Sequence, residues 1–467
     1  MTTLFSLAVL AGGVARLAKL FPADGASLKR VFRFAPRRAA AGLTACGLML
    51  ALAACGGGGS SSDDSSTTSS KTTSSTQSPV TASSTNTMTV TVEQGLSDFA
   101  NQPFVTVTVC APGSTTLCDT IDHVLLDTGS TGLRVLSSAL SSTTLAGMPR
   151  EQLASSGYYI DACGQFVSGY TWGAVRTGDV QLGSQTASSV PFEVIGDSAA
   201  GTAPTTCSGG GNNLGTVSQL GANGILGLQG QIRDCGTYCV TSTLSNYYFA
   251  CASGSGCSTA STVPLSQQVT NPVSMLGSGY NNGIVLSMPT VSDSGQATAS
   301  GTLYLGVGTQ TNNTITSASQ IPLDAQFEFQ ATYGGTANQY SFIDSGSNYL
   351  TFRDSTIARC TGIDYQDYYC PSSVQTQSVT FAPNSGASSS SGSYTGTFKV
   401  GNMIALLSNS NIFAFNDLAA YGLIETTAGQ GGLDFGMPFF YGRYVVIKNE
   451  SSSGAGDAYA AFASNGA

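Results

Sequence analysis

The sequence predicts an all-β protein made of two related lobes, and three observations support this. Gly is abundant, at 57 residues, and only 9% of the residues are charged, which suits many strands and turns rather than a helical bundle. At 467 residues the chain is long enough for a large two-lobed body. A strand-like stretch ending in Asp-Thr-Gly-Ser (123–130) has a second copy, ending in Asp-Ser-Gly-Ser (340–347), whose acid lies 217 positions later (344 minus 127).

The first 54 residues form an expected signal-peptide region. Basic residues at 29–38 precede an apolar run at 39–54, which ends at Cys55. The sequence Leu-Ala-Ala-Cys at 52–55 resembles a bacterial lipobox, whose cysteine becomes the lipidated N-terminus. A short membrane helix is the alternative, but about 16 apolar residues are few for a membrane span. We expect a lipoprotein anchored to the membrane at Cys55.

The segment after this cysteine, residues 55–88, is rich in Gly, Ser and Thr. It has no apolar period and cannot build a core, so we interpret it as a tether that spans roughly 30 Å as a flexible coil. Gly56 follows the cysteine, and by resemblance to Gram-negative lipoproteins this implies sorting to the outer membrane. The expected location is therefore the bacterial cell envelope, with the body on the periplasmic side or at the surface.

The remaining chain is divided by the repeat. We place an N-terminal β lobe at 89–285, a C-terminal β lobe at 286–450 and a tail at 451–467. Strand-like segments precede each acid, and each is followed by an apolar pair and Gly, in GILGLQ (224–229) and in LDFG (433–436). Two lobes built alike are the simplest account of this pattern.

Ten of the twelve cysteines follow Cys55, an even number that predicts up to five disulfides in an exported chain. The close pairs 110/118, 251/257 and 360/370 are the first candidates, although spacing does not fix the connectivity. Cys235 and Cys239 could also be metal ligands, but a chain with a single histidine leaves a zinc site short of partners. We therefore expect no metal.

The charge balance and the single histidine argue against a nucleic-acid-binding protein and against a Ser-His-Asp hydrolase. There are 17 Lys and Arg against 26 Asp and Glu, a net charge of -9, so we expect no nucleic-acid partner. A Ser-His-Asp triad would need His123, the one histidine, at the start of the strand into Asp127. We interpret His123 as structural.

The paired motifs resemble the pepsin-like aspartic proteases, in which two β lobes each give an Asp-Thr/Ser-Gly-Ser/Thr loop to a shared cleft. In that family an apolar-apolar-Gly segment crosses each loop. GILGLQ matches this pattern closely, and LDFG matches it more loosely. The resemblance covers about residues 89–450. It implies a bilobal pepsin-like fold around a central cleft and endopeptidase activity on a polypeptide substrate. The chain is also similar to an uncharacterised family of bacterial lipoproteins.

The chemistry expected of the two acids, Asp127 and Asp344, follows from their charge. Two carboxyl groups within hydrogen-bonding reach hold one proton between them, so one acts as base and the other as acid. A water held by Asp127 and Asp344 would lose a proton as it attacks a peptide carbonyl. This scheme needs no cofactor.

Six neighbours are expected to support the pair: Thr128, Gly129, Ser130, Ser345, Gly346 and Ser347. The glycines permit a tight bend that aims amide N–H groups at the carboxylates. By resemblance, the Thr128 and Ser345 hydroxyls bond the two loops to each other. The two serines that close the motifs would bond the outer carboxylate oxygens.

Two positions depart from the family. The segment 163–183 matches the hairpin flap, where the usual tyrosine falls on Phe166, and Tyr170 is the nearest phenol that could donate a hydrogen bond instead. Arg134 stands where the family often has Trp. Either Arg134 lies in the cleft and recognises an acidic substrate group, or it pairs with a local acid.

We expect an enzyme, because both acids keep their full sequence context, and we expect it to be a monomer. The alternative is a non-catalytic lipoprotein that binds a peptide or glycan on the same scaffold, since a fold alone does not establish function.

Overall fold

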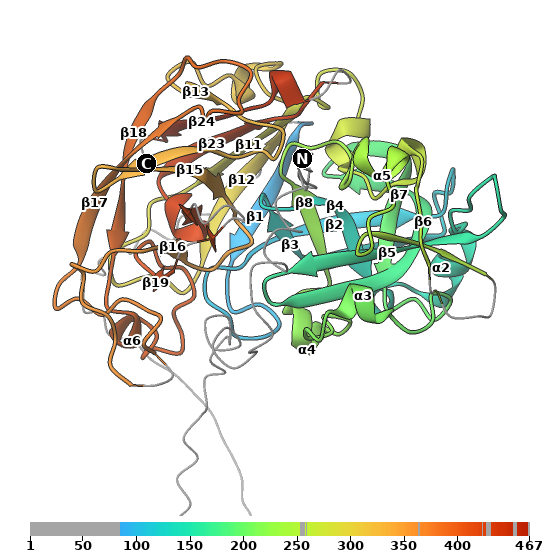
Figure 1. The fold of residues 1–467 in the computed structure, drawn as a ribbon, viewed down its shortest axis with the longest axis horizontal. Coiled ribbons are helices and arrows are strands. Elements are labelled where there is room, and N and C mark those ends of the chain that lie inside the picture. The colour runs from blue at the N-terminus through green and yellow to red at the C-terminus, as the bar shows by residue number, and fades with distance from the viewer. Residues whose placement is uncertain are drawn as a thin grey trace, which may run out of the picture. The chain divides into compact units, whose positions relative to one another are not determined.

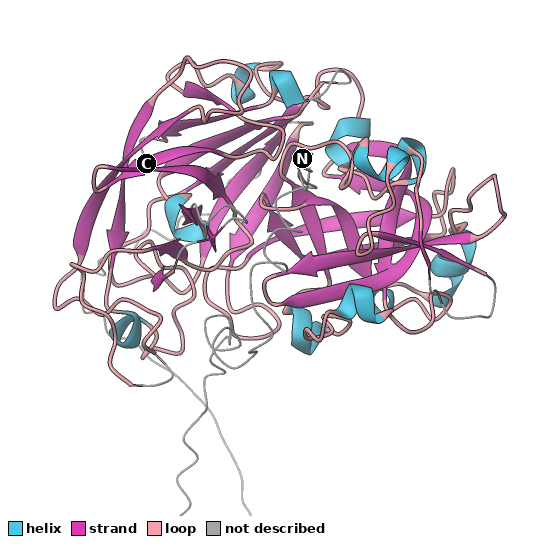
Figure 2. Cartoon of the chain, viewed as in Figure 1, coloured by secondary structure: helices cyan, strands magenta, loops and turns pink. Residues whose placement is uncertain are grey.

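The computed structural model describes residues 85–252, 257, 259–362, 365–422, 424–425, 431–451 and 455–465. The predicted signal region, Cys55 and the tether up to residue 84 lie outside these residues. Strands are the predominant regular structure of the described chain, which forms two β lobes, and this confirms the predicted all-β, bilobal fold (Figures 1 and 2).

The strands of the N-terminal half are β1 (Thr87–Val92), β2 (Pro103–Cys110), β3 (Cys118–Asp127), β4 (Thr131–Leu136), β5 (Tyr159–Phe166), β6 (Gly169–Leu182), β7 (Gln185–Ile195), β8 (Gly224–Leu228), β9 (Tyr248–Cys251) and β10 (Thr259–Ala260). β4 and β8 are buried along their whole length, whereas other strands alternate buried and more exposed residues. In β1, for example, Met88, Val90 and Val92 are buried.

The strands of the C-terminal half are β11 (Gly283–Met288), β12 (Ala299–Leu305), β13 (Ser319–Pro322), β14 (Phe329–Tyr333), β15 (Thr336–Ile343), β16 (Leu350–Phe352), β17 (Gln375–Ala382), β18 (Tyr394–Val400), β19 (Ala419–Tyr421), β20 (Ile424–Glu425), β21 (Gly431–Gly432), β22 (Asp434–Phe435), β23 (Arg443–Lys448) and β24 (Tyr459–Ser464).

Short helices lie in the connections. They are α2 (Ser142–Gly147), α3 (Thr205–Ser208), α4 (Val217–Leu220), α5 (Tyr238–Thr241) and α6 (Met403–Leu406), with the 3-10 helices η2 (Ser137–Ala139), η3 (Leu265–Gln267), η4 (Pro272–Met275), η5 (Thr311–Asn313), η6 (Met437–Phe439) and η7 (Ala455–Asp457). In the described part of the chain, no helix is long and apolar enough to cross a membrane.

One sheet of fifteen strands runs through both lobes, in the order β10-β9-β5-β6-β7-β4-β8-β3-β2-β1-β12-β11-β23-β24-β13. The lobes are joined where β1 pairs with β12, with Val90 opposite Gly301. A second sheet of seven strands, in the order β18-β17-β14-β15-β22-β16-β19, belongs to the C-terminal lobe. The first strand of the described chain is therefore paired with a strand from its second half.

The two lobes repeat one crossing motif. In the N-terminal lobe β8 runs parallel to β3 and antiparallel to β4. In the C-terminal lobe β22 runs parallel to β15 and antiparallel to β16. Each crossing strand is the apolar-Gly segment singled out in the sequence. The loop between the two outer strands of each motif is consequently fixed from both sides.

The C-terminal lobe extends beyond the predicted limit at residue 450. β24 pairs with β23 along its full length and with β13 at the sheet edge. Its Phe462 is buried against Phe329, Phe381 and Phe439, with ring centroids 5.1–6.3 Å apart. Residues 459–464 therefore belong to the core rather than to a tail, because the four consecutive apolar residues at 460–463 are buried where this strand completes the sheet.

Five disulfides join the ten cysteines that follow Cys55. They are Cys110–Cys118, Cys163–Cys207, Cys235–Cys239, Cys251–Cys257 and Cys360–Cys370. The three close pairs proposed from the sequence are among them. The bond between Cys235 and Cys239 removes the thiolates that a zinc site at that place would need.

Candidate active site

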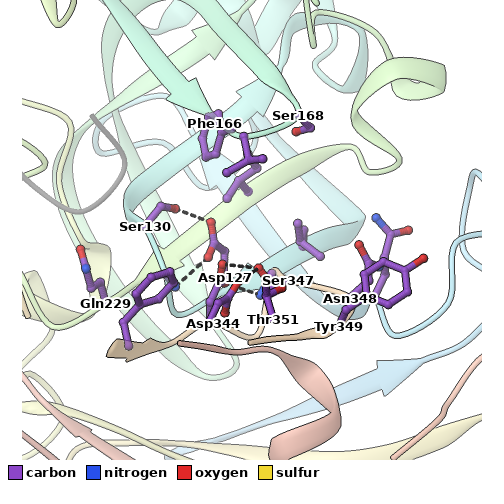
Figure 3. Close-up of a pocket in the computed structure, with 18 of the residues that line it drawn as sticks. Asp127, Ser130, Phe166, Ser168, Gln229, Asp344, Ser347, Asn348, Tyr349 and Thr351 are labelled. Carbon is purple, nitrogen blue, oxygen red and sulfur yellow. Dashed lines mark hydrogen bonds between the residues drawn. The ribbon is translucent and has the colours of Figure 1, made fainter. Parts of the chain in front are cut away.

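The two acids of the repeat lie at equivalent places in the two crossing motifs. Asp127 is the last residue of β3 and is opposite Gly227 of β8. Asp344 follows directly after β15, whose Ile343 is opposite Phe435 of β22. Both side chains line one cleft between the lobes (Figure 3).

Each acid is held by the same two donors from its own loop. The amide N–H of Gly129 donates to Asp127 Oδ1 at 2.8 Å, and that of Gly346 donates to Asp344 Oδ1 at 2.7 Å. The hydroxyl of Ser130 donates to Asp127 Oδ2 at 2.5 Å. The hydroxyl of Ser347 is 2.8 Å from Asp344 Oδ2. Both carboxyl groups are thus fixed in orientation.

The two loops also bond each other beneath the acids. The amide N–H of Thr128 donates to Ser345 Oγ at 3.1 Å, and the amide N–H of Ser345 donates to Thr128 Oγ1 at 2.9 Å. Each hydroxyl in turn donates to a strand carbonyl of the other lobe: Thr128 to Ile343 O, and Ser345 to Leu126 O. Four hydrogen bonds therefore join the lobes at this point.

The glycines are required because the opposite acid lies against them. A Cβ atom on Gly129 would lie 2.4 Å from Asp344 Cγ, and one on Gly346 would lie 2.9 Å from Asp127 Oδ1. Neither glycine has a positive φ angle, so the sequence-based argument from a tight bend is not the main reason for them. Any side chain at these two positions would push the acids apart.

The electrostatic environment favours one shared proton. The pKa of Asp344 is raised well above its ordinary value, first by burial, then by the charges of Asp127 and Asp434 and by a hydrogen bond to Asp127. Among the described residues that line the cleft there are four acids, Asp127, Glu328, Asp344 and Asp434, and no Lys, Arg or His. With no cation among these residues, the second ionisation of the pair is costly.

The hairpin of β5 and β6 covers the cleft through its turn. Phe166, Val167 and Ser168 line the cleft, and Figure 3 shows Phe166 and Ser168 above Asp127, with Asp344 below it and Ser347 to its right. Tyr170 pairs with Gln165 and packs with the cluster around Trp172, outside the cleft. The interpretation of Tyr170 as a replacement donor is therefore wrong, because side chains alternate across the hairpin and this one points to the other face.

Arg134 does not line the cleft with the acids either. Its guanidinium donates to Glu193 through Nη1 and to Asp234 Oδ2, at 3.0 Å, through Nη2. Arg134 is 5% exposed, and both carboxylates are also buried. Of the two interpretations, pairing with local acids is the correct one, because two internal carboxylates already surround the charge.

His123 is also outside the cleft. Its ring stacks edge-on against Phe104, and its nitrogens lie 3.3 Å from Asp122 and 3.5 Å from Glu93. This placement agrees with a structural role.

Sequence reasoning missed one acid of the site. Asp434 is 5% exposed, lines the cleft, and its Oδ2 lies 2.6 Å from the hydroxyl of Ser347. Its signal was visible in LDFG, where an acid stands in a segment that is apolar in the other copy, GILGLQ. The contact with Ser347 could not be seen, because 87 positions separate the two residues.

The chain is similar to one described protein family and to solved structures. Residues 82–462 match the model of a family described as "Protein of unknown function (DUF3443)". The comparison with curated proteins found no match. Among solved structures, the chain is similar to a crystal structure of aspartic proteinase from Irpex lacteus, with 14% sequence identity and a TM-score of 0.42, over 81% of this chain and 96% of that one.

Proposed function

We propose that this chain, which belongs to the DUF3443 family, is an aspartic-type endopeptidase that cleaves peptide bonds with a water held between Asp127 and Asp344. One observation carries the proposal: two acids from different lobes face each other, each held by an amide and a serine of an equivalent loop. The arrangement is the one that the resemblance to pepsin-like proteases implied.

The reaction needs one proton on the pair. In the resting site Asp344 holds the one proton of the pair, in line with its raised pKa. As the water oxygen attacks the peptide carbonyl carbon, Asp127 accepts a proton from the water and Asp344 donates its own to the carbonyl oxygen. The diol that forms collapses when Asp127 passes its proton to the amide nitrogen, Asp344 takes a proton from a diol hydroxyl and the C–N bond breaks, which leaves a carboxylic acid and an amine. The pair then again holds one proton.

The shape and lining of the cleft suit an extended polypeptide. Apolar side chains from both lobes, including Leu125, Ile225 and Phe342, line it together with the acids. Phe166 at the flap turn can cover a bound chain by apolar contact but has no hydroxyl to donate to it. We expect the cleft to prefer apolar residues on either side of the cleaved bond.

The test is a peptidase assay on the purified mature chain with denatured casein, over a pH series. We expect cleavage by the wild type, loss of at least about a thousandfold in Asp127→Asn and in Asp344→Asn, and inhibition by a statine-type compound. Asp417→Asn, which changes a buried acid outside the cleft, is the control and should retain activity. If the wild type and both cleft variants are equally inert at every pH, the enzyme proposal fails, and binding of intact casein would then favour the non-catalytic alternative.

We also propose that the protein is an exported lipoprotein anchored at Cys55 in the cell envelope. The basic and apolar segments before Cys55 support this, and five disulfides are typical of an oxidising compartment. Cells fed a labelled fatty acid should incorporate it into the wild type and not into Cys55→Ser. Equal labelling of the two proteins would contradict the anchor.

A further inference from the structure

We propose that Asp434 is a third acid of this site, protonated in the working enzyme, which donates through Ser347 toward Asp344 and so sets the upper pH limit of activity. Asp434 is a positioning residue here, because it acts on the reacting pair through Ser347. The inference rests on the proposed peptidase function and specifies how that site is regulated by pH.

The position of Asp434 is fixed by the crossing strand. It is the first residue of β22, opposite Phe342 of β15 on one side and Thr351 of β16 on the other. Both neighbouring strands belong to the motif that holds Asp344. The backbone of Asp434 is therefore held beside the loop that carries Ser347.

A count of hydrogens assigns the proton. The hydroxyl of Ser347 lies 2.8 Å from Asp344 Oδ2 and 2.6 Å from Asp434 Oδ2, yet it has one hydrogen to donate. One of the two acids must therefore donate to Ser347. The proton that Asp344 holds is engaged in its hydrogen bond with Asp127, and the amide of Gly346 donates to Asp344 Oδ1, so Asp434 is the acid left to donate to Ser347.

In the described chain, Asp434 lacks a second hydrogen bond that would stabilise its charged form. Its Oδ1 is buried and has no hydrogen-bond partner among the described residues. A charged Asp434 would thus keep a single hydrogen bond in a buried site, which is costly. The proton belongs on Asp434, and the chain of donors runs from Asp434 to Ser347 to Asp344.

The first lobe provides an internal comparison. Ile225 of β8 is opposite Leu125, two residues before Asp127, as Asp434 is opposite Phe342, two residues before Asp344. Ile225 also lines the cleft, but it has no group that could donate to Ser130. The third acid is therefore confined to the Asp344 side, and the apolar residue at the equivalent place defines a natural control substitution.

The charges around Asp434 determine when it loses its proton. Burial raises its pKa to about 7; the hydrogen bond with Ser347 opposes this rise, and the charge of Asp127 adds to it. The other ionisable residues that line the cleft are Glu328, Asp344, Tyr349 and Tyr368, none of them a cation. Above about pH 7, ionisation of Asp434 removes the donor to Ser347 and adds a negative charge beside the pair.

The activity test compares pH profiles of kcat/KM for the mature wild type, Asp434→Asn and Asp434→Ile. The Asn amide donates to Ser347 at every pH, so the alkaline limb should move upward by about one pH unit or more. Ile offers no donor, so kcat/KM should fall by roughly tenfold at acidic pH, the order seen when a residue that orients a reacting group is lost. An alkaline limb that is the same in the wild type and Asp434→Asn would overturn the role in activity.

A second measurement does not depend on peptidase activity. Because the folded-state pKa of Asp434 is raised above the unfolded value, its contribution to stability is complete below about pH 4 and is lost as pH rises toward about 7. Relative to Asp434→Asn, the wild type should lose resistance to urea across that window. Parallel stability curves would overturn the proton assignment. Diverging curves in a protein that cleaves nothing would instead support the proton on Asp434 and refute the peptidase function.

Discussion

Thr128 and Ser345 bond each other's loops reciprocally: the amide N–H of each donates to the side-chain oxygen of the other, at 3.1 and 2.9 Å. The two residues are 217 positions apart and come from different lobes. Their bonds lie directly beneath the two acids. These bonds tie the two loops together and so help to set the relative position of the acids.

Ser345→Ala should weaken both stability and activity. The change leaves the buried Thr128 N–H without its acceptor, which costs about 1–3 kcal/mol of unfolding free energy. The kcat of casein cleavage should fall as well, because the loops are no longer joined. Urea unfolding and the peptidase assay measure the two effects. Ser137→Ala, which removes an exposed hydroxyl bonded to Gly196 O, should change stability by less than about 0.5 kcal/mol.

Arg134→Met should destabilise the N-terminal lobe strongly. It leaves the buried carboxylates of Glu193 and Asp234 without their cation, at a cost of about 3–5 kcal/mol at pH 7. The pKa of each of these acids is raised by burial, so without Arg134 both prefer the protonated form and the deficit should shrink as pH falls toward 4. Lys399→Met removes an exposed pair with Asp293 and should cost no more than about 1 kcal/mol. Similar losses in the two variants would contradict the buried network.

Asp417→Asn should stabilise the protein at neutral and alkaline pH. Asp417 is buried, and neither carboxylate oxygen has a hydrogen-bond partner among the described residues. Burial raises its pKa to about 7, so its protonated form contributes stability that is complete below about pH 4 and is lost as pH rises toward 7. At pH 8 the variant should be more stable by about 2–4 kcal/mol, with little difference at pH 4.

The exposed carboxylate of Asp122 offers the matched control, since 70% of its side chain is accessible. Asp122→Asn should leave urea unfolding nearly unchanged at both pH values. A gain in Asp417→Asn that is as large at pH 4 as at pH 8 would argue against titration of this acid.

Removal of the Cys163–Cys207 disulfide should cost more than removal of Cys235–Cys239. The first closes a loop of 44 residues and ties β5 of the flap hairpin to α3, whereas the second spans 4 residues. Loop-closure entropy predicts losses of about 4 and about 2 kcal/mol for the paired Cys→Ala variants. Thermal unfolding of both variants under non-reducing conditions measures the difference. The reverse order would show that chain entropy does not govern these bonds.

The sequence alone was sufficient for features that repeat or that depend on local pattern. The two copies of strand-Asp-hydroxyl-Gly-Ser predicted two equivalent lobes with Asp127 and Asp344 as partners, and three cysteine pairs followed from close spacing. The face on which Tyr170 lies was also within reach, since it follows from the register of the hairpin. These features depend on near neighbours along the chain or on a comparison of the chain with itself.

Only the tertiary structure decided which charges meet. Glu193 and Asp234, the partners of Arg134, are 59 and 100 positions away, and Ser347 is 87 positions from Asp434. No local pattern encodes such contacts, because they arise when separate strands pack and their side chains are buried together. Burial then raises the pKa values of these acids, since a charge that water would stabilise has lost its solvent. The sequence could therefore identify the two acids of the repeat, while the fold determined the third acid beside them and the internal partners of Arg134.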